Sequence, residues 1–154
     1  MGGGRFRYWA RSEKQMTGSC ICGAVRVTID AKPPFIHDCN CSLCRKSGAA
    51  WGYFATSCVS VMGETLPFMR RDKDTPIVAV HACRACAATT HFALTTAYKG
   101  QNPLVDLLGV NMRLFDPDEL HGVEVRYPDG KAWSGQGPYG FRREARTISD
   151  NARW

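Results

Sequence analysis

The sequence lacks the long apolar runs that membrane spans and secretory signals require. No stretch of about 18 apolar residues occurs along the chain, and the first twenty residues, MGGGRFRYWARSEKQMTGSC, contain no apolar segment. We therefore expect a cytoplasmic protein that has no membrane partner.

A sustained helical pattern is also missing. Instead, Val25, Val27 and Ile29 alternate with polar residues in AVRVTID, as in a strand with one buried face. Similar short runs recur as WGYFAT, SCVSVM, TPIVAVHA, TTHFALT, LLGVNMRLF and GVEVRY. Helices are expected only around residues 42–46 and 116–121, where Pro117 would follow an Asp116 cap. These patterns predict a mostly β fold of compact antiparallel sheets.

The middle of the chain lacks an excess of either charge. The net charge is +6, but the surplus lies in residues 1–15 and 131–154. We predict a flexible basic N-terminal extension over residues 1–15, a compact domain over 16–130 and a basic C-terminal tail over 131–154. A nucleic-acid-binding domain more often carries its basic residues across the folded body, so nucleic acid is not expected as a partner.

Cysteine, in contrast, is abundant. Of the eight cysteines, Cys58 stands alone, and the other seven fall into three groups: Cys20-x-Cys22, Cys39-x-Cys41-x-x-Cys44 and Cys83-x-x-Cys86. A disulfide scaffold is disfavoured because nothing indicates an oxidising compartment, and cysteines two residues apart on a strand are poorly placed to bridge each other. The same spacing puts both thiols on one face, and CxxC brings two together in a turn. Zinc is therefore the first choice of ion, and an iron–sulfur cluster is the second.

Seven clustered cysteines divide between tetrahedral sites as four and three. The two pairs would close a structural site, whereas the group of three would leave a vacant position, as in a catalytic zinc site. Spacing alone does not fix this division, because Cys58, His37 or His81 could supply a fourth ligand to the second site.

The motifs GSCICGAVRV, CNCSLCRKSGAAWGYF and HACRACAATTHF resemble, in order and spacing, those of the glutathione-dependent formaldehyde-activating enzyme family, which also includes centromere-protein-V-like proteins. The resemblance runs from about Thr17 to Gly130. It implies a fold of the β-tent type stapled by zinc, with two zinc ions per chain. The structural ion would be held by Cys20, Cys22, Cys83 and Cys86, and the second, associated with catalysis, by Cys39, Cys41 and Cys44.

One position departs from the family pattern. Family members usually have glycine directly after the last CxxC, where this chain has Ala87. If that position requires a positive φ, alanine costs about 1 kcal/mol there.

The resemblance also implies a function, that of a zinc-dependent carbon–sulfur lyase acting on a thiol–aldehyde adduct. An example is the formation of S-hydroxymethylglutathione from glutathione, the cosubstrate, and formaldehyde. The expected partners are thus a small-molecule thiol and an aldehyde. The sequence itself offers no convincing general base, serine nucleophile or phosphate loop.

Two basic residues, Arg45 and Lys46, directly follow the group of three cysteines. They are candidates for binding the carboxylates of glutathione, and the simpler interpretation is that they offset the charge of the thiolates. Trp51, Tyr53 and Phe54 could line a substrate pocket, but their spacing on a strand favours the core. The rival hypothesis is a non-catalytic zinc-binding module that contacts protein or nucleic acid through the basic tails.

Overall fold

A computed structural model describes residues 14–154 of the chain. Its elements, in chain order, are β1 (Met16–Ser19), β2 (Arg26–Ile29), β3 (Phe35–His37), α1 (Ser42–Ser47), β4 (Trp51–Phe54), η1 (Thr56–Cys58), β5 (Val59–Met62), β6 (Thr65–Phe68), β7 (Val78–Cys83), β8 (Thr89–Leu94), α2 (Thr96–Gln101), β9 (Leu108–Asn111), η2 (Met112–Leu114), η3 (Pro117–Leu120), β10 (Glu124–Pro128) and β11 (Phe141–Thr147).

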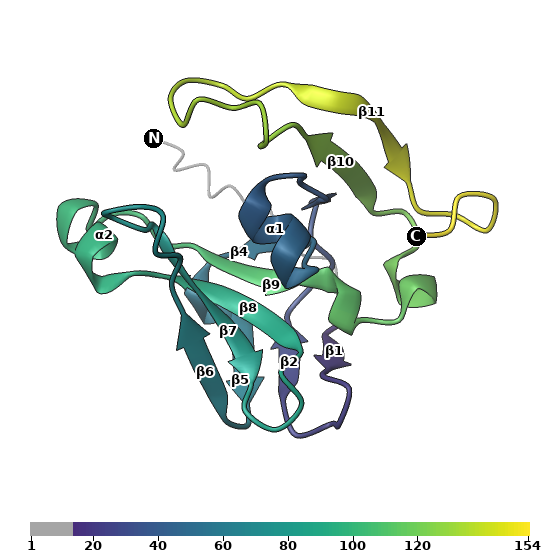
Figure 1. Ribbon diagram of the computed structural model, residues 1–154. Helices are drawn as coiled ribbons and strands as arrows, with labels where there is room; N and C mark the ends of the chain where they lie inside the picture. The colour runs from purple at the N-terminus through teal and green to yellow at the C-terminus, as the bar shows by residue number, and fades with distance from the viewer. Residues whose placement is uncertain (1–13) are drawn as a thin grey trace, which may run out of the picture.

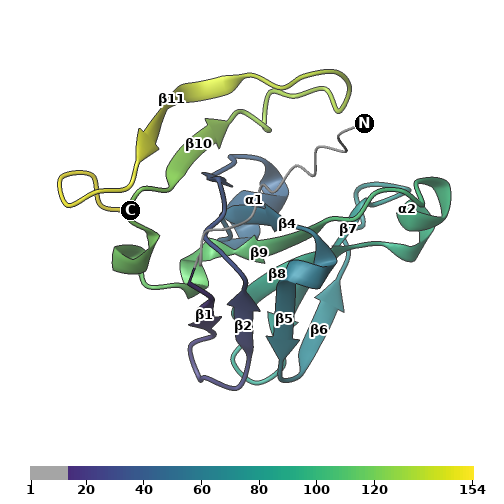
Figure 2. The same cartoon turned by 180° about the vertical axis from the view of Figure 1, so that it is seen from behind.

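The strands of the described range form two sheets. The smaller has the order β1-β2-β5 and the larger the order β11-β10-β3-β4-β9-β8-β7-β6. The prediction of a mostly β fold is confirmed, but the larger sheet is mixed, because β3 and β10 pair in parallel. Alternation of apolar and polar residues cannot reveal this pairing, since it describes a strand's faces and not its neighbours. In both views the β10–β11 hairpin lies above α1, on the side away from the smaller sheet (Figures 1 and 2).

The two helical segments expected from the sequence are present. The first is α1, and the second is η3, which begins at Pro117 after an Asp116 side chain that accepts a hydrogen bond from the Asp118 N–H. The helix α2 was not predicted. Its sequence, TAYKGQ, has no apolar stripe, and it is held by an N-cap, in which the Thr95 hydroxyl accepts from the Tyr98 N–H.

The C-terminal segment differs from the basic tail predicted over 131–154. Residues 141–147 pair with β10, and Ile148 is buried in the core. The prediction missed this strand because FRREART has exposed side chains throughout and therefore no apolar alternation. Most of the predicted N-terminal extension lies outside the described residues.

The buried side chains form two clusters. The larger joins the small sheet to the large one and includes Val27, Ile29, Ile36 and Val110. The smaller lies beneath α1, where Cys44 and Ala49 meet Trp51, Val80 and Phe92. The large sheet therefore packs apolar side chains against the helix that carries the cysteines.

No helix within residues 14–154 has the length and apolar character needed to cross a membrane.

Candidate metal centres

Four cysteines meet where two hairpin turns come together. Cys20 and Cys22 lie in the turn between β1 and β2. Cys83 is the last residue of β7, and Cys86 lies in the turn that follows it. Their sulfur atoms all lie within 4.8 Å of one another, with Cys20 Sγ 3.6 Å from Cys22 Sγ and Cys22 Sγ 3.8 Å from Cys83 Sγ. A tetrahedral zinc ion about 2.3 Å from each sulfur requires sulfurs about 3.8 Å apart, so this donor set fits zinc.

The backbone of both turns supports thiolates. The Val25 N–H donates to Cys20 Sγ over 3.2 Å, and a hydrogen bond from the Ala88 N–H is the main cause that lowers the pKa of Cys86 to about 6. The sequence argument placed Cys20 and Cys22 on one face of a strand. They instead occupy a turn closed by the Gly23 N–H, which donates to the Cys20 carbonyl.

The turn after β7 contains the only non-glycine residue with positive φ in the described range. This residue is Ala87, at φ 62°, and its N–H donates to the Cys83 carbonyl over 2.9 Å. The position therefore has the left-handed conformation for which the family's usual glycine is suited.

The other cysteine group lies at the start of α1. Cys39, Cys41 and Cys44 place their sulfurs within 4.8 Å of one another, and Cys41 Sγ lies 3.3 Å from Cys44 Sγ. Cys41 is the N-cap of the helix, and its sulfur accepts from the Cys44 N–H. Hydrogen bonding with Cys39 and Cys44 holds the pKa of Cys41 well below that of an ordinary thiol. The pKa of Cys44 is raised by its hydrogen bonding with Cys39 and Cys41 and by burial. The cluster thus favours a thiolate and presents three soft donors, which suits zinc.

Trp51 contacts the three-cysteine cluster. Its indole N–H donates to Cys44 Sγ over 3.3 Å, and the side chain is buried against Phe92. The expectation that Trp51 is a core residue was therefore incomplete, because the same side chain supports the fold and contacts a sulfur.

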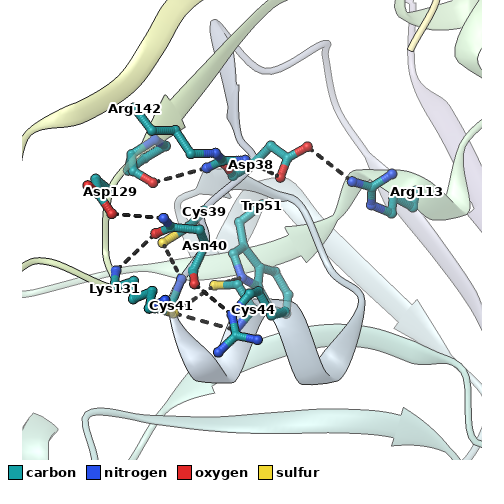
Figure 3. A network of polar contacts seen from close by, with 12 residues as sticks. Asp38, Cys39, Asn40, Cys41, Cys44, Trp51, Arg113, Asp129, Lys131 and Arg142 are labelled. Atoms are coloured by element: carbon teal, nitrogen blue, oxygen red, sulfur yellow. Dashed lines mark hydrogen bonds and ion pairs between the residues drawn. The ribbon is translucent and has the colours of Figure 1, made fainter.

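Residues of the C-terminal hairpin hold the loop that carries these cysteines (Figure 3). Asp38 accepts from Arg142 and Arg113, each over 3.2 Å, and Arg142 also donates to the Asp38 carbonyl. Asn40 donates to Asp129 over 2.8 Å and accepts from the Lys131 N–H. The polar residues that alternate with the cysteines in DCNC are thus tied to residues 129–142.

Gly130 contributes to the same contact through its lack of a side chain. A Cβ at this position would lie 2.5 Å from Cys39 Sγ and 2.9 Å from Cys41 Cβ. Any larger residue would therefore displace the cysteines.

Comparison with known proteins identifies the relatives of this chain. The family model described as glutathione-dependent formaldehyde-activating enzyme matches residues 15–122. The chain belongs to this family. A crystal structure of a Rhodobacter sphaeroides protein is similar over 70% of this chain and 97% of that one, at 26% identity and a TM-score of 0.52. A search of curated proteins finds no match.

The match to the glutathione-dependent formaldehyde-activating enzyme family ends before β10 begins. It contains all eight cysteines, Arg45 and Lys46, but none of residues 129–142. The hairpin contacts to the cysteine loop therefore lie beyond the segment that identifies the family.

Three basic side chains lie on or beside α1. Arg45 and Lys46 are exposed, and Arg45 Nε donates to the Asn40 carbonyl over 3.0 Å. The third, Arg70, was missed by sequence analysis. It donates to Ser42 Oγ over 3.1 Å and pairs with Asp72. No motif distinguishes Arg70, because only the folding of the β6–β7 loop against α1 brings it to the cysteines.

The alternative fourth ligands lie outside both sulfur clusters. Among the described residues, the groups able to hold a metal contain neither Cys58 nor any histidine. His37 is buried and its Nδ1 lies 3.1 Å from the Tyr53 hydroxyl, while His81 stacks on His91 with ring centroids 4.3 Å apart. The fold therefore places Cys58, His37 and His81 outside both metal-binding clusters, although their spacing in the sequence made them candidates.

Proposed function

We propose that this protein is a zinc-dependent carbon–sulfur lyase that joins a thiol to an aldehyde, with glutathione as the thiol. In the synthetic direction the thiol sulfur bonds to the carbonyl carbon, and the carbonyl π electrons move to oxygen. The oxygen takes up a proton to balance the one that the thiol releases. The product is an S-hydroxyalkyl thioether, which is S-hydroxymethylglutathione if the aldehyde is formaldehyde.

The observation that carries the proposal is the difference between the two clusters. Cys20, Cys22, Cys83 and Cys86 provide a complete tetrahedral set between two hairpins, which suits a structural ion. Cys39, Cys41 and Cys44 provide only three donors, which suits a site where substrate completes the coordination. Zinc held by these three cysteines would lower the pKa of a bound thiol, so that a thiolate would form near neutral pH.

The protein's own groups would bind and orient the substrates. The N–H of Trp51 and the backbone N–H of Cys44 donate to the sulfurs and offset part of their negative charge. Arg45, Lys46 and Arg70 provide the positive charge that the carboxylates of glutathione require. Arg70 is the best placed of the three, since its pairing with Asp72 and Ser42 holds it beside the first turn of α1.

The test compares one cysteine from each cluster. We expect elemental analysis of the wild-type protein to find two zinc ions per chain. Cys83→Ser should lower the melting temperature markedly, because the binding energy of a structural zinc ion is folding energy. Cys41→Ser should keep the fold and lose one zinc ion together with glutathione-dependent consumption of formaldehyde. Cys58→Ser is the matched control, and we expect two zinc ions and full activity.

Two results would contradict the proposal. One is a single zinc ion per wild-type chain that glutathione does not affect. The other is equal loss of folding in Cys41→Ser and Cys83→Ser, which would mean that both clusters are structural.

A further inference from the structure

The loop between β10 and β11 forms a small pocket next to the three-cysteine cluster. The pocket has a volume of about 280 Å³ and is lined by Asp129, Ala132, Trp133, Ser134, Gln136, Pro138, Tyr139, Gly140 and Phe141. Asp129 lines the pocket, and at the next residue, Gly130, an added Cβ would lie 2.5 Å from Cys39 Sγ, so the pocket borders the cluster. Tyr139 connects the two as well, since its ring packs against His37, two residues before Cys39.

Three aromatic side chains line part of this pocket, and polar groups make up most of the rest of its surface. Trp133 and Tyr139 meet edge to face at 6.0 Å, and Tyr139 meets Phe141 at 5.8 Å. The indole N–H donates to the carbonyls of Gln136 and Gly137, which fixes the ring as one wall. Trp133 is 42% exposed, Tyr139 38% and Phe141 56%. Large aromatic side chains that are exposed together around one hollow are a feature of binding sites.

The charge of the pocket restricts what it can bind. Among the described residues that line it, none is basic, and Asp129 is acidic. A carboxylate of glutathione is therefore poorly matched to this pocket and better matched to Arg45, Lys46 and Arg70 around α1.

The volume of the pocket restricts which aldehyde could fill it. Formaldehyde has two heavy atoms and would occupy the space of about two waters, roughly 60 Å³ by the volume of a water in the liquid. Most of the pocket would then stay empty of substrate. A benzene ring with its aldehyde group uses the aromatic walls through stacking and edge-to-face contacts.

We propose that this pocket binds the body of an aromatic aldehyde, whose carbonyl group is thereby presented to the thiol at Cys39, Cys41 and Cys44. The inference rests on the proposed function and deepens it, since it names the class of aldehyde. It also assigns a binding role to the residues that follow the family match.

The first experiment compares benzaldehyde with formaldehyde as the partner of glutathione in the zinc-loaded protein. We expect a higher kcat/KM for benzaldehyde in the wild type. Trp133→Ala should lower the ratio of the benzaldehyde to the formaldehyde kcat/KM at least about tenfold, since even one methylene in an apolar pocket changes specificity by about 10–200-fold. Trp133→Phe should recover part of the ratio. Phe68→Ala removes a more exposed aromatic residue on β6, at the opposite edge of the large sheet, and should leave the ratio unchanged.

The second experiment needs no turnover. Benzyl alcohol, an unreactive analogue, should bind the wild type and Phe68→Ala equally, as followed by saturation-transfer NMR, and should bind Trp133→Ala and Tyr139→Leu at least tenfold more weakly. Equal binding to all four proteins, or an unchanged kcat/KM ratio in Trp133→Ala, would overturn the proposal. If benzyl alcohol binds as expected but neither aldehyde reacts, the lyase function has failed, while the pocket stands as an aromatic binding site.

Discussion

At the scale of single residues, two positions differ in how they meet a need for glycine. Gly130 has the small residue that its surroundings require, whereas Ala87 stands where glycine would suit the backbone better. Gly130 leaves the space that the sulfur of Cys39 occupies. Ala87, in contrast, holds a left-handed conformation at φ 62° in the turn that carries Cys83 and Cys86. A Cβ in this conformation is unfavourable by about 1–2 kcal/mol, and a glycine at the same position would avoid this cost.

Ala87→Gly should therefore stabilise the protein. We expect the free energy of unfolding to rise by about 1 kcal/mol, which corresponds to an increase of about 2–4 °C in the melting temperature of a chain of this size. Calorimetry of the zinc-loaded protein measures the change in melting temperature. Ala88→Gly is the control: Ala88 has no positive φ, so glycine there should destabilise. A lower melting temperature for Ala87→Gly would show that the turn is not strained.

At the scale of elements, each cluster is built from turns that only become neighbours in the folded chain. The β1–β2 and β7–β8 hairpins supply one pair of cysteines each. The loop before α1 supplies the group of three and is held from outside by the β10–β11 hairpin, through Asp38 and Asn40. Because these contacts are polar and specific, they fix the orientation of the loop and not only its position.

Arg142→Ala should loosen the three-cysteine site and leave the four-cysteine site intact. Arg142 donates to the Asp38 side chain, the Asp38 carbonyl and the Pro128 carbonyl. Loss of such a supporting contact typically weakens metal affinity about 10–100-fold. We expect a chelator to remove one of two zinc ions faster by a similar factor.

Arg146→Ala provides a matched control on the same strand, since Arg146 faces solvent and forms no ion pair within residues 14–154. If both variants release zinc at the wild-type rate, the hairpin does not support the cysteine loop.

At the scale of the whole molecule, a buried histidine and the half-buried histidine stacked on it link folding to pH. His91 is buried beside His81, and burial, followed by the charge of His81, lowers the pKa of His91 to about 4. An unfolded histidine titrates near pH 6.5, so the unfolded state binds more protons between these two values. The free energy of unfolding should therefore fall as the pH decreases from about 6.5 to about 4, and His91 should contribute no slope above that window.

Urea unfolding at several pH values tests this sign. In that window each pH unit should change the free energy of unfolding by up to about 1.4 kcal/mol per histidine. His91→Gln should reduce the slope relative to the wild type. The lost hydrogen bond to Thr90 shifts the free energy without changing its slope, and zinc release in acid affects both proteins alike. Equal slopes would place the proton uptake elsewhere.

The sequence by itself determined the fold class, the short helices at α1 and η3, and the grouping of cysteines. Each is a local property, because alternation, caps and motif spacing act over a few residues. It could not determine that β3 and β10 run in parallel, nor that β11 extends the sheet with side chains exposed throughout. Arg70 and Arg142 carry no local signal. Only the tertiary structure brings these residues, so far apart in the chain, to one cysteine loop, because hydrogen bonds and packing between distant segments depend on the whole arrangement of strands.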